Sequence, residues 1–245
     1  VNVDMDYPYN VAGGMQDNGS WVGPSNVWRS GGITNHDWQE VYFGDGFDVL
    51  FRPDDNRYVY AMSQGGNVGM VDRETGKGTF IRPLHPDGTW LRFNWNAAMA
   101  QDPFNDCGSY YGSQFVHYST DCGQNWEILS PDLTTNDPEK QQQATSGGLT
   151  IDNTQAENHT AILAIAPSPH DEDVIWVGTD DGRLHITQDK GDSWTDVSDR
   201  LPGVQAGSWI PFIQVSPHNA AEAFVVVNDY RRNDFRPMVF HTTDF

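Results

Sequence analysis

Short runs of alternating apolar and polar residues follow one another along the chain, and Gly, Pro, Asn and Asp interrupt them every few residues. Such alternation, with many β-branched and aromatic residues, predicts β-strands rather than helices. Four longer stretches, which begin at Phe47, Phe93, Ala161 and Ile210, share one order of elements. Each has an apolar run, a Pro-containing turn, a second apolar run, a turn with Gly or Asp, and a third run. The pattern therefore predicts a repeated unit of three or four antiparallel strands.

A short motif, Ser/Thr-x-Asp-x-Gly-x-x-Trp, follows the third run at 119–126 and again at 187–194, and its first three positions recur at 242–244. We call this motif the box. Its Asp can accept hydrogen bonds from backbone N–H groups of the turn, its Gly supplies a positive φ, and its Trp buries a large ring between neighbouring sheets. Every position thus has a structural explanation without a ligand. The residues assigned to the boxes are Ser119, Asp121, Gly123, Trp126, Thr187, Asp189, Gly191, Trp194, Thr242 and Asp244.

Repeated units of this length, with three or four strands each, are typical of β-propeller blades. We therefore predict an all-β fold, a single β-propeller with about four and a half blades. The expected ranges are a partial blade at 1–30, blades at 31–80 and 81–130, a long inter-blade loop at 131–160, a blade at 161–200 and a partial blade at 201–245. Because a propeller closes on itself to hide its sheet edges, we expect the chain to be part of a larger propeller or to complete one with another chain.

The resemblance to a known group rests on the boxes and on five further segments. These segments are GGMQDNGSW (13–21), GDGFDV (44–49), RFNWN (92–96), SPDLTTND (130–137) and WVGTDDGRLHITQDKGDSW (176–194). Together they resemble the Asp-box (BNR) repeat propellers, a sortilin-like superfamily that includes large exported bacterial proteins often labelled glycosyl hydrolase-like. The resemblance implies a propeller fold, and a fold does not by itself carry a chemistry.

The balance of charge narrows the class of partner. With 14 basic and 34 acidic side chains, the chain has a formal net charge of −20. Such a surface repels nucleic acid phosphates and anionic lipids, so neither is an expected partner. No apolar run reaches the roughly 18 residues that span a bilayer, so direct membrane insertion is not expected either.

Cys107 and Cys122 are the two cysteines of the chain. They flank a hairpin that is expected to turn near Ser113 and Gln114, which places them opposite or diagonal to each other and makes a disulfide feasible. The alternative is two unpaired buried thiols. We favour the disulfide, which persists in oxidising compartments, and therefore expect an extracytoplasmic location (periplasmic, cell-surface or secreted).

Candidate binding residues lie in two sets of loops that share one face of a propeller. The first set enters the innermost strands, and the second joins the second and third strands of each blade. The ligand-binding candidates on this rim are Gln64, Trp90, Arg92, His159, Trp209, Tyr230 and Arg231. Carboxylates and aromatic faces on one rim suit a carbohydrate, although several of these residues also suit plain turns.

Catalysis by a glycoside hydrolase requires two carboxylates about 5 to 9.5 Å apart. The candidates are Asp45 with Asp180 or Asp181. A sialidase is not expected, because FRPD at 51–54 lacks the Ile of that family's FRIP-like segment. The eight His residues show no ligand spacing, so we predict no metal site and no cofactor; a weak structural Ca²⁺ among the acidic loops is the most that the pattern allows.

The function favoured by these patterns is a non-catalytic, extracytoplasmic binding or scaffolding propeller. Its partner would be a protein, a peptide or a glycan held at the loop rim or along a sheet edge, which is what the likeness to sortilin-like propellers implies. One alternative is a glycoside hydrolase that acts on a β-glucan or xyloglucan with paired Asp residues. A second alternative is a structural subunit of a larger membrane-associated assembly.

Overall fold

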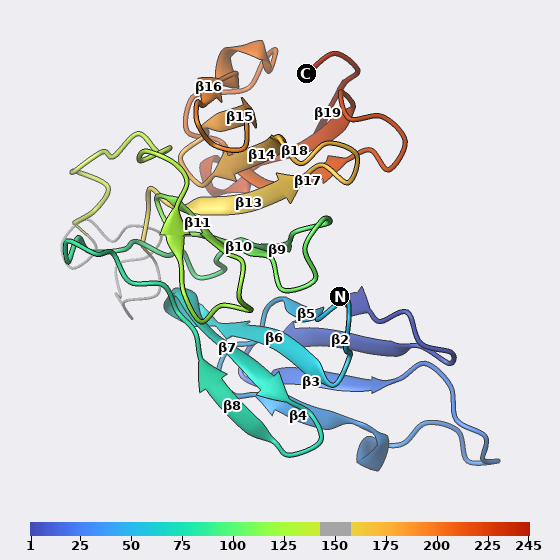
Figure 1. Ribbon diagram of the computed structural model, residues 1–245. Coiled ribbons are helices and arrows are strands. Elements are labelled where there is room, and N and C mark those ends of the chain that lie inside the picture. The colour runs from blue at the N-terminus through green and yellow to red at the C-terminus, as the bar shows by residue number, and fades with distance from the viewer. Residues whose placement is uncertain (143–157) are drawn as a thin grey trace.

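The chain folds into antiparallel sheets that follow one another in sequence order around an open arc (Figure 1). A computed structural model describes residues 1–142 and 158–245. Within these residues there are five sheets, four of four strands and one of three, and the helices are short 3-10 turns. The prediction of an all-β chain with blades of three to four strands is confirmed.

The strands of each sheet are consecutive in the chain. The first sheet holds β1 (Asn2–Val3), β2 (Asn10–Met15), β3 (Gly19–Pro24) and β4 (Gln39–Tyr42), and the second holds β5 (Val49–Phe51), β6 (Tyr58–Ser63), β7 (Asn67–Asp72) and β8 (Lys77–Phe80). The third holds β9 (Met99–Gln101), β10 (Ser109–Gly112), β11 (Val116–Ser119) and β12 (Glu127–Ile128). The fourth holds β13 (Ile162–Pro167), β14 (Val174–Thr179), β15 (Leu184–Gln188) and β16 (Thr195–Asp196), and the fifth holds β17 (Trp209–Val215), β18 (Ala223–Asp229) and β19 (Asp234–Thr242). The 3-10 turns are η1 (Asn35–Asp37), η2 (Gln64–Gly66), η3 (Ser198–Arg200) and η4 (Tyr230–Arg232).

The first sheet differs from its expected range. A partial blade was expected at 1–30, but β4 pairs with β3 through Trp21↔Glu40 and Val22↔Gln39, so this sheet has four strands and reaches Tyr42. Residues 25–38 between the two strands carry no strand pattern, and this excursion hides the returning strand in the sequence. The strands of the third, fourth and fifth sheets lie inside the ranges 81–130, 161–200 and 201–245. Part of the expected loop at 131–160 lies outside the described residues.

The hydrophobic core is divided into layers between successive sheets. One cluster joins Ala12 and Val22 of the first sheet to Val59 of the second. The next cluster joins the second and third sheets, the third joins the third and fourth, and the last packs Trp176 of the fourth sheet with Val225 of the fifth. Strands in the middle of the arc are buried on both faces, as their near-continuous apolar sequences require. Each of the three middle sheets thus packs against two neighbours, and the first and fifth sheets pack against one each among the described residues.

The two complete boxes fasten a sheet to the sheet before it. The indole Nε1–H of Trp126 donates to the carbonyl of Ile81 at 2.7 Å, and that of Trp194 donates to the carbonyl of Leu129 at 3.1 Å. Ile81 and Leu129 each come directly after the outermost strand of the preceding sheet. The rings therefore fill the space between two sheets while their N–H groups stay hydrogen-bonded, as a partly buried indole requires.

Within each box the polar side chains are occupied by the turn itself. Asp121 Oδ1 accepts the N–H of Asn125, and Asp189 Oδ1 accepts the N–H of Ser193, both at 2.8 Å. These bonds, led by those from the Asn125 and Ser193 side chains, lower the pKa of both carboxyls. The contacts agree with a structural role for the box.

Loops of neighbouring sheets approach each other closely at two glycines whose φ angles are positive. A Cβ on Gly66 (φ +74°) would lie 2.2 Å from the ring of Phe93, and a Cβ on Gly182 (φ +86°) would lie 2.8 Å from the backbone nitrogen of Gly207. Both glycines lie in loops between a second and a third strand, and both contacts are with the segment that enters the next sheet. The two kinds of loop therefore share one face, as expected.

Cys107 and Cys122 form a disulfide with a Cα–Cα distance of 4.5 Å, which confirms the pairing predicted from the hairpin. The backbone N–H of Cys122 also donates to the carbonyl of Cys107 at 2.9 Å. The bond ties the segment before β10 to the box after β11. A disulfide is compatible with an oxidising compartment. Among the described residues, none of the helices has the length and apolar character that crossing a bilayer would need.

We predict that Trp194→Ala lowers the free energy of unfolding by about 3 kcal/mol, because the half-buried ring between the third and fourth sheets is lost. Trp194→Phe should cost less, since it keeps an aromatic ring and loses only the N–H donor. Urea unfolding followed by circular dichroism measures both. Equal stabilities for the Ala and Phe variants would contradict the fastening role.

Candidate functional site

Asp45 lies in the segment that enters β5, where it joins the first sheet to the second. Its Oδ1 accepts the backbone N–H of Asp17 at 2.9 Å, and its own N–H donates to Oε1 of Gln64 at 2.8 Å. The side chain is buried, with 8% of its surface exposed. Asp45 therefore holds two loops of the rim together.

The bond between Asp45 and Gln64 recurs in the next two sheets. Gln114 Oε1 accepts the N–H of Arg92 at 2.8 Å, and Asp180 Oδ1 accepts the N–H of Ala161 at 2.9 Å. In each sheet the acceptor follows the second strand, and the donor lies just before the first strand. Gln64 and Asp180, two of the predicted site residues, thus share a role in positioning the rim. Sequence reasoning missed Gln114, although it stands at the position equivalent to theirs.

Asp180 and Asp181 are surrounded by protein groups. Asp180 Oδ2 accepts Nδ2 of Asn94 at 2.6 Å and lies 3.4 Å from Nδ1 of His159, and none of the Asp180 surface is exposed. Asp181 Oδ2 accepts both the N–H and the hydroxyl of Thr135 at 2.7 Å. Asp181 thereby ties the segment after the third sheet to the fourth sheet.

The expected catalytic pair is not brought into one group of contacting residues. The hydrogen-bond partners of Asp45 belong to the first and second sheets, whereas those of Asp180 and Asp181 belong to the segments of the third and fourth. All three carboxylates are buried and accept hydrogen bonds from the backbone, so each contributes to positioning the rim. Their catalytic assignment stays a prediction.

Arg92 is also engaged within the protein. Its Nη2 lies 2.6 Å from Oδ2 of Asp132, and its Nε donates to the carbonyl of Thr160 at 3.0 Å. A charge-assisted pair of this kind, with the arginine side chain 12% exposed, fixes the two ends of the long excursion after the third sheet. Arg92 thus holds Asp132 and Thr160 together at the rim.

Four of the predicted rim residues form one aromatic and cationic cluster beside Asp180. The ring of His159 stacks on Trp209 with centroids 6.5 Å apart, and the guanidinium carbon of Arg231 lies 3.3 Å from the centroid of Trp209 and 4.4 Å from that of Tyr230. Burial lowers the pKa of Arg231, while the charge of Asp180 acts in the opposite direction. The structure therefore brings together His159, Trp209, Tyr230 and Arg231, as the sequence predicted.

Two aromatic rings remain open at this rim. Tyr230 is 49% exposed beside Arg231, and Trp90 is 72% exposed. The backbone of Trp90 is fixed, because its carbonyl accepts Nε2 of Gln114 at 3.0 Å. Arg231 lies over a face of both Trp209 and Tyr230, so the ring of Trp90 and the exposed part of Tyr230 supply free apolar surface.

Asp48 is a candidate that sequence reasoning did not single out. It lies in the segment that enters β5, directly before Val49, and it is half-buried. Burial raises the pKa of its carboxyl, and the amino group of Val1 opposes this shift. A carboxylic acid with a raised pKa is a typical general acid. The signal in the sequence was the second Asp of GDGFDV, which the rim pattern passed over.

Metal binding finds no support in the described ranges. Within residues 1–142 and 158–245, no three His, Cys, Asp or Glu side chains are grouped so that they could hold an ion. The weak Ca²⁺ site therefore stays a prediction.

Comparison with known proteins supports the fold. No protein-family model and no curated protein matches the chain. Solved structures similar to it include the GH74 xyloglucanase of Xanthomonas campestris (15% identity over 95% of this chain and 34% of that chain, TM-score 0.56). An ancestral GH74 enzyme (13%, 99% and 29%, TM-score 0.60) and the GH74 enzyme of Niastella koreensis (14%, 95% and 33%, TM-score 0.58) are similar as well.

At these low identities, the structural similarity establishes only a shared fold, the β-propeller type of the GH74 enzymes. The chain spans about a third of the length of these enzymes.

We predict that Asp180→Ala lowers the free energy of unfolding by about 2 to 4 kcal/mol, because two buried donors, Asn94 Nδ2 and the Ala161 N–H, lose their acceptor. Asp180→Asn should cost roughly half as much, since its single oxygen keeps one of the two bonds. Guanidinium unfolding gives both values. A rise in stability for either variant would contradict the positioning role and would instead suggest a carboxylate kept for catalysis at a cost to folding.

Proposed function

We propose that this chain contributes a glycan-binding rim to a carbohydrate-active propeller of the glycoside hydrolase kind, and that its ligand is a β-linked glucan such as xyloglucan. The observation that carries the proposal is the presence of two exposed aromatic rings, Trp90 and Tyr230, on one internally braced rim. The similar solved structures are GH74 enzymes, one of them a xyloglucanase. They favour the hydrolase-type alternative over the expected non-catalytic propeller that binds a protein, a peptide or a glycan.

Contacts connect the two rings across three sheets. Gln114 binds the Trp90 carbonyl and the Arg92 N–H, and Arg92 binds the carbonyl of Thr160, next to His159. From His159 the contacts continue through Trp209 and Arg231 to Tyr230. These hydrogen bonds and ring contacts link the backbone segments that carry the two rings, which reduces the entropy lost on binding an extended ligand.

The chemistry of the rim suits a neutral glycan. Exposed aromatic faces cover the C–H surfaces of sugar rings, and the guanidinium of Arg231 offers donors to hydroxyl oxygens. The net charge of −20 disfavours an anionic polysaccharide. A β-glucan carries no charge, so its approach is not opposed.

The disulfide leads us to propose an extracytoplasmic location as well. The outer faces of the first and last sheets expose apolar side chains, among them Val3, Met15, Phe212 and Val239. We propose that these faces pack against further blades, either of the same protein or of another chain of an assembly.

We predict that Trp90→Ala weakens binding of xyloglucan oligosaccharides about five- to tenfold, which is the loss of about 1 to 1.4 kcal/mol from one ring contact. The control is Trp28→Ala, which removes an even more exposed ring from the connection between β3 and β4, away from the rim. Isothermal titration calorimetry measures both affinities. No binding by the unchanged protein, or an equal loss in the Trp28 variant, would contradict the proposal.

Hydrolysis is a second candidate function, favoured by the raised pKa of Asp48. A carboxyl that keeps its proton to a higher pH than usual can protonate the oxygen of a glycosidic bond as the bond breaks. Asp48 would be the acid of such a reaction, with a second carboxylate about 5 to 9.5 Å away as base or nucleophile.

We predict that the unchanged protein releases reducing ends from xyloglucan or a β-glucan at a rate that falls as pH rises through the Asp48 pKa, and that Asp48→Asn abolishes this release. Because the folded-state pKa is raised, ionisation of Asp48 disfavours folding as pH rises through it, so the variant should gain stability relative to the unchanged protein at neutral pH but not at pH 3. A reducing-sugar assay and unfolding at the two pH values test this. Retained activity in the variant would exclude Asp48 as the acid.

A further inference from the structure

The few positive charges of this acidic protein are mostly paired. The chain has a formal net charge of −20, and most of its 14 basic side chains form an ion pair with a carboxylate. A basic side chain without such a partner is therefore unusual here. Among residues 1–142 and 158–245, the basic side chains without an ion pair are Arg73, Lys77, Arg82, Lys140, Arg200 and Arg231.

Arg73 and Arg82 belong to the packed interior. The guanidinium carbon of Arg73 lies 5.6 Å from the ring centroid of Phe51, and that of Arg82 lies 4.8 Å from the ring centroid of Phe93. Both rings are buried, and burial lowers the pKa of both guanidinium groups. Neither arginine has an open aromatic face beside it on which a ligand could lie.

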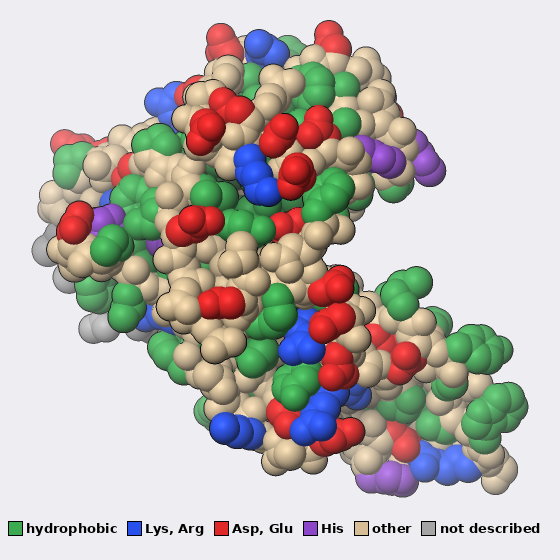
Figure 2. Space-filling model, viewed as in Figure 1, with side chains coloured by type: hydrophobic (Ala, Val, Ile, Leu, Met, Phe, Trp, Pro, Cys, Tyr) green, Lys and Arg blue, Asp and Glu red, His purple; other side chains and the backbone are tan. Residues whose placement is uncertain are grey.

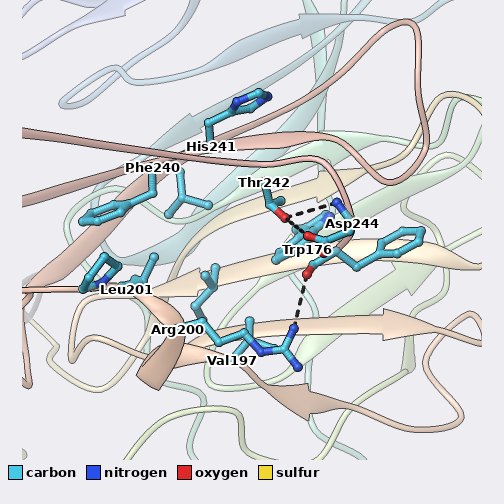
Figure 3. A pocket seen from close by; sticks show the side chains of 12 residues that line it. Trp176, Val197, Arg200, Leu201, Phe240, His241, Thr242 and Asp244 are labelled. Atoms are coloured by element: carbon cyan, nitrogen blue, oxygen red, sulfur yellow. Dashed lines mark hydrogen bonds between the residues drawn. The ribbon is translucent and has the colours of Figure 1, made fainter.

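Arg200 lies at a cavity of about 420 Å³ between the fourth and fifth sheets (Figure 3). The carboxylate of Asp244 lines the same cavity, so a negative charge is close to this arginine. Nη1 of Arg200 donates to the carbonyl of Phe245 at 3.2 Å, which Figure 3 shows as a dashed line. The protein therefore already supplies Arg200 with an acceptor.

The two lysines are accounted for in other ways. Lys77 begins β8, whose four residues are all exposed, so its ammonium group is a solvated surface charge. Lys140 lines a pocket of about 430 Å³ to which Asp137, Asp181 and Asp199 also contribute, so nearby carboxylates offset its charge. Arg231 is the basic side chain that remains.

Arg231 is held by aromatic rings rather than by a carboxylate. Its guanidinium carbon lies 3.3 Å from the centroid of Trp209 and 4.4 Å from that of Tyr230, and the side chain is exposed. Attraction to a ring face orients a guanidinium group without using its N–H donors. Apart from a hydrogen bond with the Tyr230 side chain, no acceptor among the described residues engages the donors of Arg231. Most of its five donors are thus free for a ligand.

The buried carboxylate of Asp180 attracts Arg231 without pairing with it. Its charge opposes the effect of burial on the Arg231 pKa. The oxygens of Asp180 are already used, because they accept the Ala161 N–H at 2.9 Å and Nδ2 of Asn94 at 2.6 Å. A partly desolvated cation without a partner gains more from an incoming anion than a fully solvated one does.

The shape of this group selects the anion. A planar guanidinium presents pairs of parallel N–H donors that match the two oxygens of a carboxylate. Tyr230 is 49% exposed beside it and offers apolar surface to the C–H groups of a sugar ring. A sugar that carries a carboxylate, which is a uronic acid, meets both groups. The net charge of −20 repels a chain of many carboxylates, so the acidic unit must belong to an otherwise neutral glycan.

We propose that Arg231 and Tyr230 form a subsite for a single uronic acid unit carried by an otherwise neutral β-glucan. The guanidinium donates two parallel hydrogen bonds to the carboxylate, and the sugar ring contacts the exposed part of Tyr230. The inference rests on the proposed function, because the neutral part of the glycan is held by the rest of the rim. It assigns to the rim a selectivity for charge that aromatic rings alone do not provide.

The test compares cellotetraose with two analogues that carry glucuronic acid in place of the glucose at one end or the other. Isothermal titration calorimetry at low salt should show that one analogue binds about tenfold more tightly than cellotetraose, because it gains a charge-assisted pair. This preference should shrink at about 1 M salt, where charges are screened within about 3 Å. Equal affinities of all three ligands would overturn this inference and leave the proposed function standing, whereas absence of binding by all three would overturn both.

Variants of the full chain locate the subsite. Arg231→Gln should abolish the preference for the acidic analogue, because the amide keeps N–H donors but has no charge. Lys77→Gln makes the same change of charge on β8, outside the rim, and should retain the full preference. Arg231→Lys keeps the charge without the planar group, so it should retain a smaller preference, and it tests the assignment even if the Gln variant does not fold. An unaltered preference in the Arg231 variants, or an equal loss in Lys77→Gln, would overturn the assignment.

Discussion

The hydrogen bond from a box indole to the carbonyl behind the preceding sheet is the interaction on which the architecture depends. It adds a directional contact to an interface that is mostly apolar, and apolar contacts have no preferred direction. Trp126 and Trp194 repeat it at two successive junctions. Because each sheet is placed by its predecessor, the sheets form an arc, and the surface is hollowed between the first two sheets and the last ones (Figure 2).

The boxes fix the sheets at one end, and hydrogen bonds fix the rim loops at the other end. In three sheets, the segment that enters the first strand is tied to the end of the second strand. Gln64, Gln114 and Asp180 follow the second strands, and each accepts a backbone N–H of that segment. Polar side chains of the rim are therefore hydrogen-bonded to the backbone of the protein. The groups left for a ligand are those that project beyond this frame, above all the rings of Trp90 and Tyr230.

Sequence patterns were sufficient for the strands, the repeated unit and the disulfide, because each depends on local alternation or on a hairpin. They failed where a long excursion intervenes: β4 returns to the first sheet only after residues 25–38, and no local signal links it to β3. They also could not show that Asp45 accepts a backbone N–H of the preceding sheet, or that Asp180 accepts one from the segment that enters its own sheet. Asp48 was missed for the converse reason, since its raised pKa comes from burial by distant segments.

We propose that a neutral β-glucan binds at the rim, which consists of the loops that enter the first strands and the loops that join the second and third strands. Hydrogen–deuterium exchange with and without a xyloglucan oligosaccharide tests this directly, because it reports protection along the whole backbone. Binding at the rim should protect 88–95 and 228–233 and should leave the boxes 119–126 and 187–194 unchanged. Protection confined to the box end of the sheets, or none at saturating ligand, would contradict it.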